Sequence, residues 1–133
     1  MQDRFKFRVV YYNDVEKKYF IFEPDLISAD GTARAYAYGE SGADEYYDTV
    51  TLNQCTGLKD KNGKLIYEGD IVKIFHVSGT MQGKYFFDVV KWNDLRCRFD
   101  TENYGIINDD DVYAVIGNIY ENSDMLKKMR IEL

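Results

Sequence analysis

The sequence contains little proline, cysteine and histidine, and each scarcity excludes a class of protein. Among 133 residues there are one proline, two cysteines and one histidine. Two cysteines, Cys55 and Cys97, are too few for a disulfide framework, and their spacing fits no zinc site. We expect both to pack as small apolar residues without a redox role. A single proline and a hydrophobic fraction of 45% argue against a disordered chain.

Long apolar runs and catalytic motifs are also missing. No run approaches the ~20 residues that a helix needs to cross a bilayer. The start of the chain, Met1 to Arg4, lacks the charged-then-apolar pattern of a signal peptide. The only histidine, His76, has no nucleophile in a recognisable motif, and no phosphate-binding loop or metal cluster is present. The sequence therefore predicts a cytoplasmic protein that is not an enzyme, binds no cofactor and does not associate with membranes.

Basic charge is scarce and unevenly placed, with a formal net charge of −6. An acidic balance disfavours a dedicated nucleic-acid binder, whose affinity depends on neutralising phosphates. The stretch from Arg98 to Lys127 has no basic residue between its ends, whereas the stretch from Lys59 to Arg98 is rich in lysine and arginine. Two interpretations stay open: solvated loops that keep the protein soluble, or complementary patches that meet between subunits.

Aromatic residues are abundant, at 16% of the chain, and favour sheet over helix bundle. Phe5 to Tyr12 alternates apolar and basic side chains and predicts a half-buried strand. After a turn at Asn13-Asp14, Tyr19 to Phe22 predicts the returning strand of a hairpin. The segment from Asp25 to Glu45 is the least readable, with a candidate strand at Thr32 to Tyr38.

The second half of the chain predicts short strands separated by glycine and Asx turns. These strands are Ile71 to Phe75, Tyr85 to Trp92, Arg96 to Phe99 and Val112 to Ile119. Such a pattern suits a small, bent antiparallel barrel of about five strands. Gly117 predicts a bulge or a close backbone approach.

A short helix is predicted at the C-terminal end. Asn122 or Ser123 is suited to accept hydrogen bonds from the free amides of its first turn. Met125, Leu126 and Met129 form a narrow apolar stripe, which predicts that this helix docks on the sheet.

The stretch from Thr56 to Ile74, TGLKDKNGKLIYEGDIVKI, organises this half of the chain. Asp60 to Gly63 predicts a turn that an Asx side chain closes. A calcium loop is the weaker interpretation, because Leu65 and Ile71 stand where a helix–loop–helix site requires glycine and glutamate. Glu68 and Asp70 would serve acid–base chemistry in an enzyme, but a role in shaping the turn is favoured.

Three segments of the sequence resemble the YopX family of phage and prophage proteins: TGLKDKNGKLIYEGDIVKI, VVKW at Val89 to Trp92, and VIGNIYEN at Val115 to Asn122. FKFRVVY near the start is similar to a drifted form of the family's opening strand. The resemblance implies an SH3-like barrel, a phage or prophage gene in a bacterial host, and self-assembly. It implies no activity, because the family carries no established catalytic residues.

The sequence as a whole predicts a mainly β protein with a minor α component and three parts. These are an N-terminal β lobe over residues 1–53, an SH3-like antiparallel barrel over 54–121, and a C-terminal helix over 122–133. We expect a homo-oligomer that makes protein–protein contacts, with a host or phage protein as a further possible partner. The alternatives are a nucleic-acid-binding module and an acidic decoy of a host nucleic-acid-binding protein. The candidate contact residues are Tyr67, Lys73, Lys91, Tyr104, Asp109, Asp110 and Asp111.

The remaining aromatic residues divide between core and surface. Phe75, Tyr85 and Trp92 join Tyr67 and Tyr104 as candidates for a ligand-facing surface, although packing in the core is the favoured interpretation. We predict in particular that Trp92 is at least partly buried against the sheet.

Overall fold

The chain folds almost entirely into β-strands in the computed structural model, which describes residues 6–23, 26–27, 33–36, 44–47, 51–77, 79–106 and 111–129. One short α-helix follows the strands of the described part, so the predicted mainly β class is confirmed. The strands are β1 (Phe7–Asn13), β2 (Lys18–Phe22), β3 (Leu26–Ile27), β4 (Ala33–Tyr36), β5 (Asp44–Tyr47), β6 (Thr51–Lys59), β7 (Leu65–Tyr67), β8 (Asp70–Phe75), β9 (Tyr85–Asn93), β10 (Arg98–Thr101), β11 (Gly105–Ile106) and β12 (Val112–Asn118). A 3-10 turn, η2 (Gly79–Met81), joins β8 to β9, and α1 (Ser123–Lys128) ends the fold.

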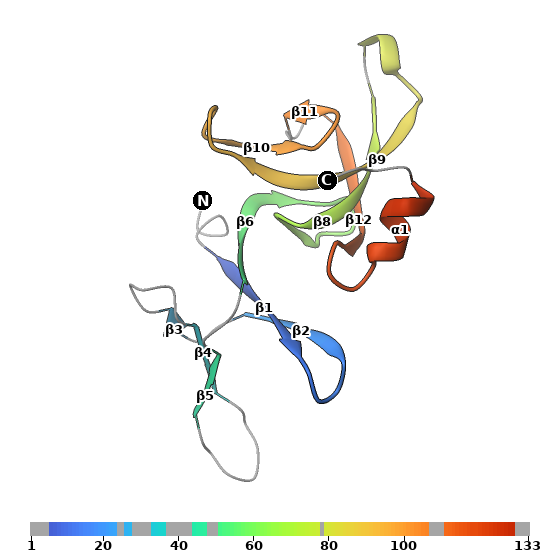
Figure 1. The fold of residues 1–133 in the computed structure, drawn as a ribbon. Coiled ribbons are helices and arrows are strands. Elements are labelled where there is room, and N and C mark those ends of the chain that lie inside the picture. The colour runs from blue at the N-terminus through green and yellow to red at the C-terminus, as the bar shows by residue number, and fades with distance from the viewer. Residues whose placement is uncertain are drawn as a thin grey trace.

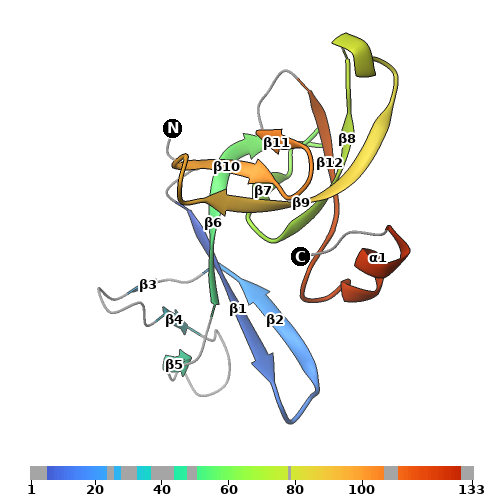
Figure 2. The same cartoon turned by 45° about the horizontal axis from the view of Figure 1, so that its top comes forward.

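The strands form antiparallel sheets in the orders β2-β1-β6-β7, β11-β10-β9-β8-β12 and β3-β4-β5. The five-stranded sheet curls into a half-barrel, which is the SH3-like barrel expected in the C-terminal half (Figure 1). The β1–β2 hairpin projects away from this half-barrel in two different views (Figures 1 and 2). The hairpin predicted near the start is confirmed, with Tyr12 opposite Tyr19 and Asn13 opposite Lys18.

Strand β6 belongs to both halves of the molecule. Its first residues pair with β1, where Val9 lies opposite Leu52. Its later residues pair with β7, where Cys55 lies opposite Tyr67. The strand thus runs through the position at which the sequence suggested a boundary between the N-terminal lobe and the barrel.

Two apolar clusters make the core of the half-barrel. One contains Ile66, Val72, Ile74, Val90 and Tyr113. In the other, Ile71 and Val89 are covered by α1 residues Met125 and Leu126 and by Met129, which confirms the predicted docking stripe. Burying a side chain such as Ile71 stabilises the fold by roughly 1.5–3 kcal/mol, so the helix is held by packing and not by its own six-residue length.

The predicted N-cap position is confirmed, but the predicted hydrogen bond from the side chain of Asn122 is wrong. Asn122 is the N-cap residue, but its side chain makes no cap hydrogen bond. Its Oδ1 accepts instead from the backbone N–H of Asn118, at 3.1 Å. This preference follows from the bulge at Gly117, where the β12–β8 register shifts between Val115 and Gly117. A Cβ at position 117 would lie 2.5 Å from Asn122 Oδ1, so the predicted close approach at Gly117 is confirmed.

The two cysteines occupy different environments. Cys55 is fully buried, as expected, whereas Cys97 is exposed, so the prediction for Cys97 is wrong. The chain turns at residues 94–97, and β10 begins one residue later, at Arg98. Cys97 therefore lies in a turn and not in the short strand that the sequence suggested.

Candidate interaction surface

Asp60 closes the half-barrel. Its Oδ1 accepts from the backbone N–H groups of Asn62 and Lys64, each at 2.9 Å, and its Oδ2 accepts from Val115 at 3.0 Å. The amide of Lys61 donates to the carbonyl of Tyr113 beside this contact, at 2.8 Å. The predicted Asx turn is therefore confirmed, and its carboxylate also fastens the turn to β12. Among the described residues, no group of acidic, histidine or cysteine side chains is arranged to hold a metal ion.

A buried ion pair joins the N-terminal sheet to the half-barrel. Arg8 of β1 donates through Nη1 to Asp70 Oδ1 at 2.6 Å and through Nε to Asn53 Oδ1 at 3.1 Å. Asp70 also accepts from the backbone N–H of Tyr67, at 2.8 Å. Burial raises the pKa of Asp70, although the Arg8 charge and the Tyr67 amide oppose the rise. Glu68 Oε1 accepts from the backbone N–H of Gln54 at 2.8 Å. Glu68 and Asp70, the two residues considered for acid–base chemistry, therefore both have structural partners.

The three segments shared with the YopX pattern meet at Gly69. Its N–H donates to Val90 at 2.8 Å, and its carbonyl accepts from Ile119 at 2.9 Å. Its φ of +87° is a conformation that other residues adopt only at a cost, and a Cβ would lie 3.3 Å from Asn53 and Tyr120. These segments are therefore scaffold, and an interaction surface has to be sought on the side chains around them.

Tyr67 lies inside this junction. Its side chain is 8% exposed, and the guanidinium of Arg8 lies 5.0 Å from the centre of its ring. Burial, together with the nearby carboxylate of Glu23, raises the pKa of Tyr67 to about 12. Its hydroxyl donates to Glu23 Oε1 at 3.4 Å. Tyr67 was predicted as a contact residue, but little of its side chain is accessible to a partner.

The other predicted contact residues that the structure describes each have a partner within the chain. Lys91 is paired with Glu102 at 3.3 Å. Tyr104 is 46% exposed and packs against Phe86, with ring centres 4.6 Å apart. Asp111 lies 3.4 Å from His76 Nδ1. Asp109 and Asp110 fall outside the residues that the structure describes.

Lys73 lies among three aromatic side chains of β8 and β9, of which Tyr85 is exposed and Phe75 and Phe87 are partly buried. Its ammonium lies 4.9 Å from the ring centre of Phe75, 4.2 Å from that of Tyr85 and 5.8 Å from that of Phe87. Tyr85 is 54% exposed. The sequence identified Lys73, Phe75 and Tyr85 singly, and the β8–β9 register, with Phe75 opposite Tyr85 and Lys73 opposite Phe87, brings them together. We call these four residues the lysine–aromatic strip.

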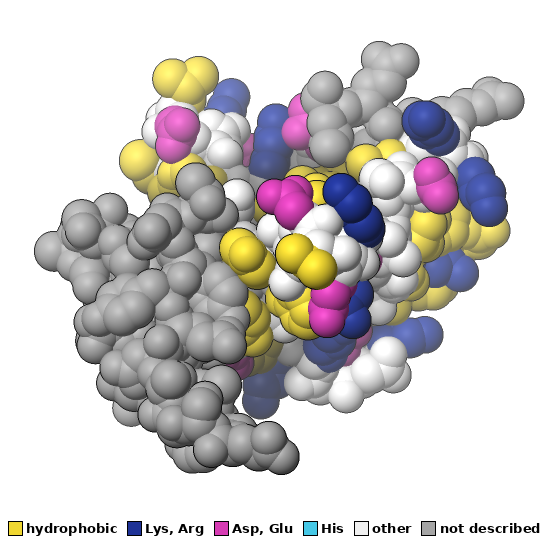
Figure 3. Space-filling model, turned by 60° about the horizontal axis from the view of Figure 1, so that its bottom comes forward, with side chains coloured by type: hydrophobic (Ala, Val, Ile, Leu, Met, Phe, Trp, Pro, Cys, Tyr) yellow, Lys and Arg dark blue, Asp and Glu magenta, His cyan; other side chains and the backbone are white. Residues whose placement is uncertain are grey.

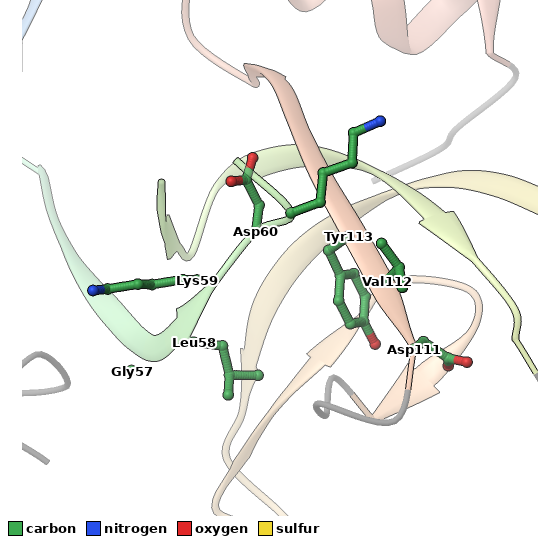
Figure 4. Close-up of a pocket in the computed structure, with 8 residues that line it drawn as sticks. Gly57, Leu58, Lys59, Asp60, Asp111, Val112 and Tyr113 are labelled. Atoms are coloured by element: carbon green, nitrogen blue, oxygen red, sulfur yellow. The ribbon is translucent and has the colours of Figure 1, made fainter. Parts of the chain in front are cut away.

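A groove of about 440 Å³ adjoins this strip, between the end of β6 and the start of β12. Figure 4 shows Leu58 on one side and Val112 and Tyr113 on the other, with Lys59 pointing outward. The complete lining is Gly57, Leu58, Lys59, Asp60, Lys61, Asp111, Val112 and Tyr113. We call this hollow the β6–β12 groove.

The groove and the strip form one continuous surface. The Lys61 ammonium lies 5.3 Å from the centre of the Phe75 ring, and Val112 lies opposite Phe75 in the β12–β8 pairing. Both acidic residues of the groove have partners: Asp60 accepts hydrogen bonds from backbone N–H groups, and Asp111 lies beside His76. The rim therefore carries two lysines, Lys59 and Lys61, beside two aspartates, Asp60 and Asp111, and the surface is suited to apolar groups flanked by charges of both signs.

Sequence reasoning missed the groove because its lining comes from two distant segments. Leu58 and Val112 are unremarkable aliphatic residues in their own strands. Only the contact between the Asp60 turn and β12 places them across a hollow. The exposure of Val112, 36%, is the structural sign that this wall is incompletely covered.

Trp92 agrees with its prediction. Its side chain is 40% exposed, and its ring meets Phe99 edge-on at 5.0 Å between centres. It therefore packs against the β9–β10 pair beside Phe99, which itself contacts the core, and is partly buried. Within the described ranges, no helix combines the length and apolar character that crossing a bilayer requires.

Comparison with known proteins supports the fold and the family. No curated protein matches the chain. A solved structure, the crystal structure of protein EF1440 from Enterococcus faecalis, is similar over 91% of this chain and 96% of that one. The two share 27% sequence identity and superpose with a TM-score of 0.55. Residues 6–127 match the YopX protein family, and the chain therefore belongs to that family.

Proposed function

We propose that this protein is a non-enzymatic protein–protein interaction module of phage or prophage origin, and that it assembles with copies of itself in the bacterial cytoplasm. The observation that carries the proposal is the lysine–aromatic strip beside the β6–β12 groove. The centres of three rings, those of Phe75, Tyr85 and Phe87, lie within 6 Å of the Lys73 ammonium on the β8–β9 hairpin.

The strip has the properties of a binding surface. A lysine against aromatic faces contributes roughly 0.5–1 kcal/mol at an exposed site and about 2 kcal/mol or more once a partner excludes water. Mutual packing also restricts these side chains before a partner arrives, which lowers the entropy lost on association. Tyrosine is enriched at the energetic centres of interfaces, and Tyr85 leaves 54% of its surface available.

A protein partner is favoured over nucleic acid by charge. The formal net charge of −6 opposes binding to a phosphate backbone. On one face, both signs of charge lie between hydrophobic side chains, without a broad basic field (Figure 3). A second copy of the chain would offer acidic segments to the strip and basic ones in return, which favours self-assembly.

The buried carboxylates support a non-enzymatic role. Asp60, Asp88 and Asp100 each accept structural hydrogen bonds. Asp88 is fully buried and binds the backbone N–H groups of Asn103, at 2.6 Å, and Tyr104, at 3.1 Å, so it shapes the turn after β10. These acids hold turns in place, and proton transfer would break the bonds that hold them.

The test is the mass in solution, measured by light scattering at several concentrations with and without DNA. The proposal expects a multimer of the 15.6 kDa chain that DNA does not alter. Lys73→Glu and Tyr85→Ala should each shift it towards the monomer. Lys128→Glu is the matched control, because it changes the charge equally on the exposed helix. A monomer at all concentrations would contradict the proposal.

One observation favours nucleic acid as the second candidate. Lys61 and Lys73 both flank the Phe75 ring, and lysines beside exposed rings bind single strands by charge and stacking. This candidate predicts DNA binding that weakens steeply with salt and that Lys73→Glu and Lys91→Glu reduce.

A further inference from the structure

The turn that Asp60 closes contains the only Asn-Gly pair of the sequence, at Asn62 and Gly63. Both residues are exposed. A Cβ at Gly63 would meet no atom within 4 Å, so the space around this residue is open. The carboxamide of an asparagine closes most readily on the next backbone nitrogen when glycine follows, because glycine has no side chain to hinder the approach.

The side chain of Asn62 is also less restrained than those of the other asparagines in the described ranges. Asn93 shows the contrast, because its Oδ1 accepts from two backbone N–H groups and its Nδ2 donates to Asp100 at 2.7 Å. Asn62 donates through its backbone N–H to Asp60 Oδ1, but its carboxamide has no hydrogen-bond partner among the described residues. The carboxamide of Asn62 is therefore free to rotate towards the nitrogen of Gly63. The asparagines with bonded side chains are Asn13, Asn53, Asn93, Asn103, Asn118 and Asn122.

We propose that Asn62 is a site of spontaneous deamidation, and that its product loosens the turn that closes the half-barrel. The Gly63 nitrogen attacks Cγ of Asn62 and forms a bond to it, while the Cγ–Nδ2 bond breaks and ammonia leaves with the proton of the Gly63 N–H. Water then opens the five-membered ring at one of its two carbonyls. Opening at Cγ gives aspartate, whereas opening at the main-chain carbonyl gives isoaspartate, whose backbone is one carbon longer. The reaction consumes water alone and oxidises or reduces nothing.

The folded turn slows this reaction without preventing it. The N–H of Gly63 donates to the carbonyl of Asp60 at 3.0 Å, and this bond holds the proton that ring closure has to remove. Because the turn is exposed, local opening breaks the bond without unfolding the core. Asn62 should therefore react more slowly in the folded chain than in the unfolded chain, but faster than the asparagines whose side chains are bonded.

The isoaspartate product cannot keep the bonds that Asp60 makes. A single oxygen, Asp60 Oδ1, accepts from the backbone N–H groups of Asn62 and Lys64, each at 2.9 Å. A backbone carbon added after position 62 separates these two N–H groups, so that one oxygen no longer reaches both. The other oxygen of Asp60 binds the backbone N–H of Val115, at 3.0 Å, and ties the turn to β12. Isoaspartate at position 62 should therefore weaken the closure of the half-barrel.

The first experiment follows deamidation of the whole chain, folded and in urea, at mildly alkaline pH. Intact mass counts the events, and peptide mapping locates them. In the folded chain, Asn62 should react at least tenfold faster than Asn93 and Asn103, which serve as internal controls, and several-fold slower than it does in urea. The proposal would be overturned if Asn62 stayed intact in the folded chain while it reacted in urea, or if the control positions reacted as fast. Equal rates in the folded chain and in urea would overturn the restraint by the turn.

Two substitutions test the chemistry of the site. Asn62→Gln requires a larger ring, and Gly63→Ala hinders the attacking nitrogen, so each should slow the reaction at this position at least tenfold. Gly83→Ala is the matched control, because Gly83 has a φ of +81°, close to the +82° of Gly63, and equally open surroundings. It should leave the rate at Asn62 unchanged. A rate that neither substitution at the site lowers would contradict ring closure between Asn62 and Gly63.

The separated products test the effect on the turn. Ion exchange separates the deamidated chains, and an isoaspartate-specific methyltransferase identifies those with the longer backbone. Their unfolding midpoint in urea should lie below that of Asn62→Asp, which carries the same added charge on a backbone of ordinary length. Equal midpoints would show that the longer backbone leaves the turn intact and would overturn the proposed loosening. These measurements concern one chain, so their outcome is independent of the proposed self-assembly.

Discussion

Asp60 illustrates how one side chain closes the half-barrel. Burial alone would raise the pKa of Asp60, but the backbone N–H groups of Val115, Lys64 and Asn62 together hold it below its ordinary value of 3.8. The carboxylate form is therefore favoured in the folded protein. Its contribution to stability is present above about pH 4 and is lost as the pH falls through the lowered pKa.

Asp60→Asn should reveal this contribution. At pH 7 the variant should lose about 2–3 kcal/mol of unfolding free energy, because an amide accepts weaker hydrogen bonds and brings an unwanted donor. The difference from the unsubstituted chain should shrink as the pH falls below about 4 and through the lowered pKa of Asp60, where the carboxylate becomes protonated. Urea unfolding followed by Trp92 fluorescence measures both quantities. A difference that stays constant over this range would contradict the assignment.

The Arg8–Asp70 pair carries the second prediction at this scale. Arg8→Met leaves Asp70, 1% exposed, without its cation, so we expect a loss of about 3–5 kcal/mol of unfolding free energy. Arg8→Met combined with Asp70→Leu removes both charges and should lose clearly less than the single substitution. Thermal unfolding of the two variants measures the contrast. Equal losses would show that the ion pair contributes no coupling between β1 and β8.

At the scale of elements, the pairing of neighbouring strands was far easier to predict than the closure of the half-barrel. The β1–β2 hairpin could be predicted because the alternation of apolar and polar residues and the turn at Asn13-Asp14 lie close together in sequence. The groove depends on Asp60 reaching Val115 across the fold, and no local pattern contains that information. The missing cap hydrogen bond of Asn122 was unpredictable for a similar reason, since its side chain binds the backbone beside the bulge at Gly117.

The turns of the β1–β2 and β9–β10 hairpins carry the prediction at this scale. Lys17 has a φ of 57° and Cys97 a φ of 51°, a left-handed conformation that glycine adopts more easily. Lys17→Gly and Cys97→Gly should each raise the free energy of unfolding by about 0.5–1 kcal/mol, after the added freedom of the unfolded chain is subtracted.

Glu16→Gly is the control for the turns, because its φ is not among the positive values. It should give no gain. Urea unfolding at pH 7 separates the three variants. A gain of the same size at position 16 would show that turn flexibility, and not the left-handed conformation, governs stability.

At the scale of the whole molecule, the lobe and the half-barrel are tied together at several points. Strand β6 pairs with β1 and with β7. The hydroxyl of Tyr120, which follows β12, accepts a hydrogen bond from Asn53 Nδ2 at 3.0 Å. The ring of Tyr120 also packs on Tyr19, with ring centres 5.7 Å apart. Because these contacts cross between the two sheets, opening one sheet would expose buried polar groups of the other.

We therefore expect the described sheets joined by β6 to unfold in one transition, although the sequence suggested a boundary at residue 53. Trp92, the single tryptophan of the chain, reports on the half-barrel, and Tyr12→Trp in a Trp92→Phe background reports on the β1–β2 hairpin. The two fluorescence midpoints in urea should coincide. An earlier midpoint at position 12 would show that the hairpin opens alone. The hairpin would then be less stable than the half-barrel, although β1 pairs with β6.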